Sequence, residues 1–220
     1  MNPMRWMAAF MIAAATAGTP ALAADESFWY GGLGAGRGNA KKTTSWAQQT
    51  DISLLAQGVT SATNISSWDT SWKIYGGYQF SEIIAAEAAY AKLGKFGGTS
   101  ALSTPAGGAG TGTWDASAFS VSAVATLPIV ENRFSVLGKL GLAYTQLDVN
   151  ETATGVGGST VVVNPTNKRT NLLVGLGLRY DITRKIGLRA EYEHYNNVGD
   201  GAVTGQTAIV VWTLGAQYRF

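Results

Sequence analysis

The sequence contains no cysteine, a single histidine and, beyond its N-terminal segment, no long apolar run. Without cysteine, neither a disulfide nor thiolate chemistry is available to the fold. The 16 basic and 14 acidic residues nearly cancel, which argues against nucleic acid as the main partner. No later stretch approaches the ~18 apolar residues that a membrane helix needs. Membrane-spanning β-strands are still compatible with the sequence, because a β-strand crosses a bilayer with about 9–11 residues of which only alternate ones are apolar.

The N-terminal segment has the three parts of a secretory signal. Arg5 gives a short charged region, an apolar run follows from Trp6 to Ala17, and Ala21-Leu-Ala23 fits the small-residue cleavage motif. We therefore predict a signal peptide over residues 1–23 and a single β-barrel domain over residues 24–220.

The stretch FWYGGLGAGRG, residues 28–38, allows two interpretations. Its glycines could form a phosphate-binding loop, but the dinucleotide fingerprint Gly-x-Gly-x-x-Gly is not met. Counted from Gly32 the last position is Arg37, and counted from Gly34 it is Asn39. Glycines at every second position belong instead to one face of a β-strand. The pattern favours a glycine-faced strand.

Alternation of apolar and polar residues recurs in about eight segments. In the last of them Trp212, Leu214 and Tyr218 share one face, and Thr213 and Gln217 share the other. Three short turns and four long polar loops should connect the segments, the turns at residues 81–82, 128–133 and 182–185 and the loops at residues 39–70, 97–115, 150–168 and 198–207. Long loops at one end and short turns at the other are typical of an outer-membrane barrel.

The two faces of these segments differ in chemistry. One face is apolar or aromatic, and we predict that its aromatic residues form lipid-facing girdles at the two membrane interfaces: Trp29, Trp72, Tyr78, Phe80, Tyr90, Phe134, Tyr144, Tyr180, Tyr192, Trp212, Tyr218 and Phe220. The other face should line the barrel interior with a charge network: Lys73, Glu87, Lys139, Arg179, Arg189, Glu191, Glu193 and Arg219. A soluble lipocalin-type barrel also alternates, but large aromatics would then line its cavity, so we favour the membrane barrel.

Four stretches of the chain carry a family resemblance, in this order: FWYGGLGAG at residues 28–36, YGGYQF followed by AAEAAY at residues 75–90, LRAEYEHYNNVGD at residues 188–200 and LGAQYRF at residues 214–220. Together they resemble the OmpA-type transmembrane domain. The resemblance implies an eight-stranded barrel in the bacterial outer membrane, with periplasmic termini and long extracellular loops. Many members carry an added peptidoglycan-binding domain, and the chain's end at Phe220 leads us to expect that this tether is absent.

The resemblance also implies an interior mesh of acids and bases instead of a wide pore. Glu87, Arg189, Glu191 and Lys139 match its positions. The sequence departs from the family pattern at two further positions, where an inward Lys is replaced by Val124 and an acid by Arg179. We therefore expect the mesh to be connected differently.

The mesh has two possible roles. Because an unpaired buried charge is unfavourable, charges of both signs at neighbouring levels should pair into a packed plug that fixes the register. The alternative is a narrow, gated ion path. Glycines on the inner face would favour that path by leaving water-filled space, and they are Gly32, Gly34, Gly36, Gly175 and Gly177.

His194 is the one candidate for catalysis. Its surroundings, EHYNN, resemble the His-x-Ser-Asn stretch of outer-membrane lipid A deacylases, but the nucleophile position would be Asn196, which has no hydroxyl to activate. We therefore expect no catalytic residue. No cluster of His, Asp and Glu has metal-ligand spacing, so neither a metal nor another cofactor is expected.

The expected partners follow from the predicted location. Arg37, Lys41, Lys42 and Lys92 lie near the predicted outer rim, where they would meet lipopolysaccharide phosphates or remain solvated. Outer-membrane lipids are thus expected partners, as is the barrel-assembly machinery, through the terminal strand that ends at Phe220. A host, phage or cell-surface partner would contact the loops. Nucleic acid is not expected.

The sequence as a whole predicts an all-β protein, an eight-stranded antiparallel up-and-down transmembrane β-barrel with short periplasmic turns and long extracellular loops. Envelope structure and loop-mediated interaction at the cell surface are the predicted function. A small, low-conductance porin-like channel is the alternative, and a lipid A-modifying enzyme is the least favoured one.

Overall fold

The computed structural model describes residues 27–104, 108–130, 133–155, 158 and 160–220. The predicted signal peptide, residues 1–23, lies outside these ranges. The described residues form ten strands and one helix.

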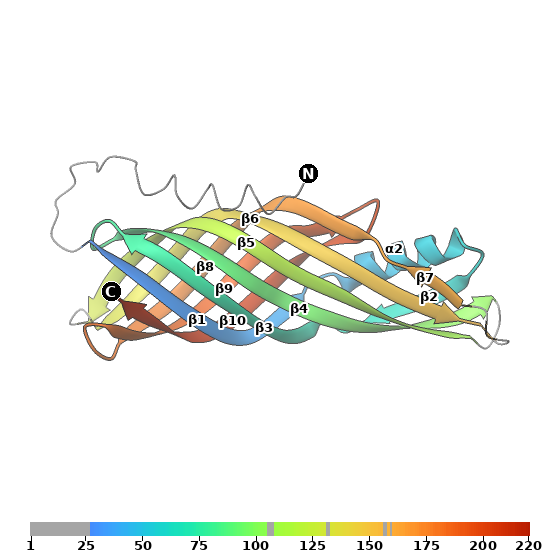
Figure 1. Ribbon diagram of the computed structural model, residues 1–220, viewed down its shortest axis with the longest axis horizontal. Helices are drawn as coiled ribbons and strands as arrows, with labels where there is room; N and C mark the ends of the chain where they lie inside the picture. The colour runs from blue at the N-terminus through green and yellow to red at the C-terminus, as the bar shows by residue number, and fades with distance from the viewer. Residues whose placement is uncertain (1–26, 105–107, 131–132, 156–157, 159) are drawn as a thin grey trace.

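Eight long antiparallel strands close into a ring (Figure 1). They are β1 (Phe28–Ala40), β3 (Trp68–Gln79), β4 (Ile84–Thr104), β5 (Ala109–Val130), β6 (Phe134–Thr154), β8 (Thr166–Asp181), β9 (Ile186–Asp200) and β10 (Gly205–Arg219). The first strand pairs with β3 on one side and with β10 on the other, which closes the ring. A closed ring has no free edge, so each spanning strand has a hydrogen-bonded neighbour on both sides, as hydrocarbon requires. The predicted fold is confirmed.

The predicted short turns lie at the end of the barrel that carries the C-terminus (Figure 1). Residues 80–83 join β3 to β4, residues 182–185 join β8 to β9, and three residues separate β5 from β6. At this end the backbone N–H of Phe220 donates to the carbonyl oxygen of Trp29 at 2.9 Å, which joins the C-terminus to β1.

The opposite end differs from the prediction of long polar loops. Residues 97–115 largely continue β4 and β5, which stay paired as far as Ala101 and Ala109. The segment 39–70 holds the helix α2 (Thr43–Leu55) and the strand β2 (Thr60–Ile65), and the segment 150–168 holds β7 (Thr160–Val163). The fourth connection is a turn of four residues, 201–204. Residues 97–115 differ from the predicted loop because a run of small polar residues extends a strand when its neighbour supplies hydrogen bonds, whereas the connections between β1 and β3 and between β6 and β8 are long, as predicted.

These additions form a compact unit, here called the head. It consists of α2, β2, β7 and the parts of β4, β5 and β6 that extend beyond the ring. In this unit β2 pairs with β4 and β7 pairs with β6, so five strands form an open sheet, and α2 contacts β2, β7 and β10. The helix lies at the end remote from the C-terminus (Figure 1). Among the described residues, no helix combines the length and the apolar character needed to cross a membrane.

The two faces of the ring are oriented as the membrane interpretation requires. The side chains of Trp212, Leu214 and Leu176 are 55%, 65% and 63% exposed, whereas Arg189 and Glu191 are 3% and 5% exposed. Further apolar residues of the outer wall are exposed as well: Leu33, Ile74, Ile84, Val121, Leu127, Leu140, Leu142, Val174, Leu178, Ile186 and Leu188. An apolar exterior around a charged interior is the arrangement of a barrel dissolved in lipid, and it excludes the soluble barrel.

The inward glycines do not leave water-filled space, contrary to the expectation behind an ion path. Tyr75 on β3 is opposite Gly32 on β1, and Tyr30 on β1 is opposite Gly77 on β3. A Cβ added at Gly32 would lie 2.4 Å from the Tyr75 ring, and one at Gly77 would lie 2.5 Å from the Tyr30 ring. Each glycine therefore accommodates the tyrosine of the neighbouring strand.

The remaining inward glycines are also covered. A Cβ at Gly34 would lie 3.4 Å from Thr213, and one at Gly36 would meet the backbone of Trp212. Lys139 and Glu193 lie against Gly175, and Glu191 lies against Gly177. Protein atoms thus occupy the space that these glycines leave.

Candidate functional site

A cluster of six charged side chains fills the middle of the barrel. Lys73 extends from β3, Glu87 from β4, Lys139 from β6, and Arg189, Glu191 and Glu193 from β9. Period-two alternation points all six inward, and all six are buried. Three bases face three acids, so the cluster has no net formal charge. Six of the eight residues predicted for the interior network are brought together here.

Lys139 lies at the centre of this cluster. Its Nζ is 2.7 Å from Glu87 Oε1, 2.9 Å from Glu191 Oε1 and 2.6 Å from Glu193 Oε1. Arg189 joins two of the same acids, with Nη1 at 2.6 Å from Glu87 Oε2 and Nη2 at 2.8 Å from Glu191 Oε1. The acids are thus shared between bases from different strands.

Lys73 completes the cluster from the opposite wall. Its Nζ lies 3.0 Å from Glu193 Oε1 and also forms an ion pair with Glu191. The cluster therefore ties β3, β4, β6 and β9 together through the barrel interior, in addition to their backbone pairing. Such a network fixes the register of strands that are not neighbours.

Three tyrosines surround the charges, and their role could not be predicted from the sequence. Tyr30 donates to Glu87 Oε2 and Tyr195 donates to Glu193 Oε2, each at 3.2 Å. Tyr75 carries Arg189 over its ring, 4.7 Å from the centroid. Their inward parity was visible in the sequence, but their partners depend on how the strands are staggered around the ring.

Arg179 and Arg219, the other two predicted members, do not join the central cluster. They flank Asp181 near the short turns: Arg219 Nη2 lies 2.5 Å from Asp181 Oδ2 and Arg179 Nε lies 3.4 Å from Asp181 Oδ1. Arg179 is where the resemblance led us to expect a departure. A second, smaller charge group therefore lies at the end of the lumen next to the short turns.

The predicted aromatic girdles lie on the outer wall. Nine of the twelve residues are exposed and the other three, Tyr78, Phe134 and Tyr192, are half-buried. They contact one another in pairs, with ring centroids 4.9 Å apart for Trp29 and Tyr78 and 4.6 Å apart for Tyr192 and Trp212. The first pair lies at the ends of β1 and β3 next to the short turns, whereas Tyr192 and Trp212 lie near the middle of β9 and β10.

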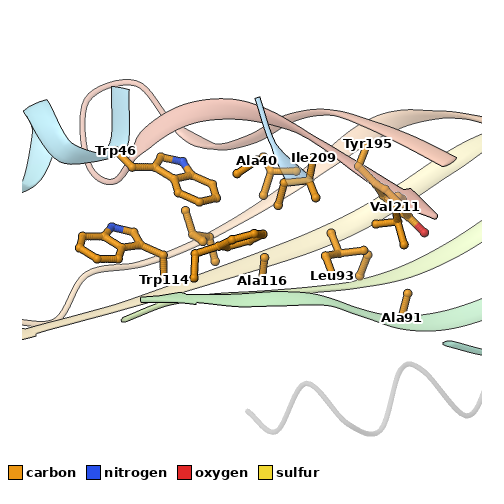
Figure 2. Close-up of a cluster of buried hydrophobic side chains, with 14 of the residues drawn as sticks. Ala40, Trp46, Ala91, Leu93, Trp114, Ala116, Tyr195, Ile209 and Val211 are labelled. Carbon is orange, nitrogen blue, oxygen red and sulfur yellow. The ribbon is translucent and has the colours of Figure 1, made fainter. Parts of the chain in front are cut away.

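An apolar core closes the lumen above the charges and continues into the head. Figure 2 shows Trp46, from α2, and Trp114, from β5, on opposite walls of this core, with Leu93 and Val211 further along it. A second group of buried residues lies in the head: Leu54, Val59, Leu102, Ala153 and Val163. The outer mouth of the barrel is therefore filled by side chains.

The helix α2 and the core beneath it were not predicted from the sequence. The buried positions of α2 include Trp46, Thr50 and Leu54, which recur every four residues. That spacing is helical, but the middle position is polar and the sequence around it lacks a long apolar period. The signal was present but too weak to distinguish a helix from a loop.

The head also buries a carboxylate that sequence analysis did not single out. Glu151 has 0% exposure and lies seven residues beyond the girdle residue Tyr144 on β6. Ser100 donates to Glu151 Oε1, Thr63 and Ser100 are linked at 2.7 Å, and Thr63 donates to Asp51 at 2.7 Å. A hydrogen-bonded chain thus runs from α2 through β2 and β4 to this carboxylate.

Two features favour the protonated form of Glu151. Burial raises the pKa of its carboxyl above the ordinary value, and the nearby Asp51 carboxylate acts in the same direction, while the hydrogen bond from Ser100 opposes them. Oε2 has no hydrogen-bond partner among the described residues. Gly110 and Gly112 on β5 make room for the carboxyl group, since a Cβ at Gly110 would lie 3.0 Å from Oε1 and one at Gly112 would overlap Oε2.

The residues that the sequence suggested for catalysis or for lipid contact do not come together in one site. Nε2 of His194 lies 2.7 Å from Asn196 Oδ1, with no hydroxyl nucleophile in this pair. Lys92 pairs with Asp115 on the outer wall at 2.5 Å, and Arg37, Lys41 and Lys42 are exposed. Within the described ranges, no group of three His, Cys, Asp or Glu side chains is placed to hold a metal ion.

Removing the central base should destabilise the barrel. Lys139→Met keeps the length of the side chain but leaves Glu87, Glu191 and Glu193 without a shared partner, so we expect the free energy of unfolding to fall by about 3–5 kcal/mol. Urea unfolding of the protein in lipid vesicles measures this change. Lys95→Met, on an exposed head position, should stay within about 0.5 kcal/mol. Adding Glu193→Gln to Lys139→Met should restore part of the loss. Equal stability of the Lys139 and Lys95 variants would show that the network does not hold the barrel.

The head should lose stability as pH rises. Because the folded head binds the Glu151 proton more tightly than the unfolded chain does, this stability is complete below the unfolded-state pKa of about 4.3 and is lost as pH rises through the folded pKa. Hydrogen exchange of β2 and β7, corrected for intrinsic rates, should therefore be faster at pH 8 than at pH 5. Glu151→Gln should abolish the dependence, and Glu82→Gln, in an exposed turn, should preserve it. A dependence that survives in Glu151→Gln would refute this assignment.

Solved structures with the same architecture come from several bacteria. The chain superimposes on Neisserial surface protein A with a TM-score of 0.55 at 13% identity, covering 89% of this chain and 100% of that one. For Ail, the attachment invasion locus protein of Yersinia pestis, the TM-score is 0.51 at 14% identity, and the match covers 89% of this chain and 100% of that one. For the outer membrane protein OprG of Pseudomonas aeruginosa, the TM-score is 0.52 at 11% identity, and the match covers 89% of this chain and 97% of that one. At these identities the likeness shows the fold alone.

Sequence comparison gives the family. No curated protein matches the chain. The family model for the OmpA-like transmembrane domain matches residues 24–220, which cover the ring and the head described above. The chain therefore belongs to the OmpA-like transmembrane domain family and is a β-barrel of the bacterial outer membrane.

Proposed function

We propose that the barrel is a sealed structural anchor that displays the head at the cell surface for interaction with other molecules. The observation that carries this proposal is the filled lumen: a neutral charge network in the middle and an apolar core at the outer mouth. A barrel filled at both levels is suited to hold and present a surface unit. A channel would need one of these levels to open.

The channel alternative loses its main support in this geometry. It depended on space beside the inward glycines, and tyrosine rings fill that space at Gly32 and Gly77. Ions crossing the barrel would also have to separate Lys139 from three carboxylates. Breaking a buried network of this kind is strongly unfavourable.

The purified protein should be electrically silent in planar bilayers. Folded insertion can be checked by heat-modifiable gel mobility on the same sample. We expect no discrete conductance steps across ±100 mV, because the network and the apolar core both block the lumen. Reproducible small openings from a fully folded sample would instead support the channel.

The head is the part of the molecule that we propose to act in contacts outside the cell. Its helix exposes Ile52 and Leu55, which lie three residues apart on one face. Large apolar side chains exposed close together on an aqueous surface are typical of interaction sites. Attachment is part of the name of Ail, and it is a class of function that this head could serve.

Surface display can be measured by cysteine labelling, since the chain has no native cysteine. Ile52→Cys, at a position 58% exposed in the head, should react with a membrane-impermeant maleimide on intact cells. Ile182→Cys, at a position 51% exposed in a short turn, should react only after the outer membrane is permeabilised. The reverse pattern would overturn the orientation and, with it, the proposed display.

We propose no enzymatic activity. His194 is turned toward the amide of Asn196, and neither residue provides the hydroxyl nucleophile of the deacylase motif. Loss of an acyl chain from the lipid A of expressing cells, measured by mass spectrometry, would contradict this proposal.

A further inference from the structure

The open sheet of the head has two edge strands, and they differ in what covers them. β2 forms one edge and lies against α2: Asp51 Oδ2 accepts the N–H of Thr63 at 3.3 Å, and Asp51 Oδ1 accepts the hydroxyls of Ser61 and Thr63, each at 2.7 Å. β7 forms the other edge, and among the described residues its backbone pairs only with β6. The β7 edge therefore keeps unused backbone donors and acceptors.

The side chains of β7 do not protect this edge. Its sequence is TVVV, residues 160–163, and Val162 is 51% exposed. Natural proteins usually block a free edge with charged side chains, proline or a bulge. Residues of these protective types begin only below β7, where Pro165, Lys168 and Arg169 follow along the same side of β6. The apolar part of the edge is thus the part farthest from the membrane.

The outer part of the head is almost uncharged. Residues 43–67, 96–114 and 149–165 contain only two charged side chains, Asp51 and Glu151. Glu151 is fully buried, and Asp51 is half-buried and hydrogen-bonded to β2. A strongly charged partner would find no complementary group on this surface. Two copies of the surface, in contrast, would approach each other without like-charge repulsion.

The β7 edge is complementary to a second copy of itself. A two-fold axis perpendicular to the sheet places two identical strands antiparallel, and each copy then contributes the same patch. With the axis at Val162, this residue is opposite its own copy and Val161 is opposite Val163, so side chains of the same face meet. The two open sheets would join into one continuous sheet.

Antiparallel pairing also fixes where the two barrels lie. β7 runs beside β6 along the length of the molecule (Figure 1), so reversing the strand points the second barrel away from the first. Two copies joined in this way are anchored in two opposing membranes. β7 pairs with Glu151–Thr154, which begin seven residues beyond the girdle residue Tyr144 on β6. The edge is therefore about 20 Å above that girdle at a strand tilt of about 40°.

We propose that the β7 edge binds the β7 edge of a second copy of this chain in an opposing outer membrane, so that two cells adhere through their heads. The occupant is a second copy because the edge is apolar, matches itself under a two-fold axis and lies on a surface without opposing charge. This inference rests on the proposed display of the head, and it adds the partner and the geometry of the contact.

Mixed populations of cells test the contact. Two populations with different fluorescent labels display the full chain, on cells whose lipopolysaccharide lacks O-polysaccharide, and we expect mixed clumps. Val162→Lys should reduce clumping about fivefold, because it places two like charges opposite each other. Val203→Lys, the same change at a position 45% exposed in the turn between β9 and β10, should leave clumping within about twofold. Equal clumping of the Val162→Lys and native chains would overturn the proposal.

Disulfide trapping tests the pairing directly, since the chain has no native cysteine. Val162→Cys is displayed on two populations whose chains carry different affinity tags, and the mixture is oxidised. We expect a disulfide-linked product that contains both tags, and no such product from Val203→Cys. A product that joins only chains of the same tag would place both copies in one membrane and overturn the opposing arrangement.

Two further controls separate this inference from its alternatives. Cells without the protein that enter the clumps would show a different receptor and overturn the second copy as partner. Ile52→Cys, added to Val162→Lys, should still react with the impermeant maleimide on intact cells, so that lost clumping is not lost display. Failure of this labelling in the otherwise native chain would refute the display itself, whereas normal labelling without mixed clumps would refute only the β7 contact.

Discussion

A strand in hydrocarbon must find every backbone hydrogen-bond partner within the protein, and the rest of this structure depends on that constraint. The pairing of β1 with β10 satisfies it by closing the ring between the two ends of the sequence. Once the ring is closed, each strand has one face toward lipid and one toward a narrow interior. The outer face must then be apolar, and any charge that the sequence provides has to be neutralised inside.

The interior meets this second requirement with few residues. Three bases and three acids cancel, and Tyr30, Tyr75 and Tyr195 border the resulting cluster. The same tyrosines explain part of the unusual glycine content of β1 and β3, because Tyr30 and Tyr75 each cover a glycine of the other strand. Glycine on these strands thus permits dense filling of the lumen instead of opening it.

Outside the membrane the constraint relaxes, and the architecture changes accordingly. Water can satisfy strand edges there, so the sheet of the head can stay open at β2 and β7. Its apolar face still has to be covered, and α2 does this with Trp46 and Leu54. The buried Glu151 is tolerated because Gly110 and Gly112 leave room for it and burial favours its neutral form.

The sequence by itself determined the ring, the direction of each face, the three short turns and six members of the charge network. These follow from a period of two residues, which is a local property of each strand. Only the tertiary structure decided that Arg179 and Arg219 pair with Asp181, that tyrosines fill the glycine positions, and that residues 43–55 form a helix over a second core. The partners of these residues come from strands or loops distant in sequence. Which side chains meet is therefore set by the stagger of the closed ring, and no local pattern encodes that stagger.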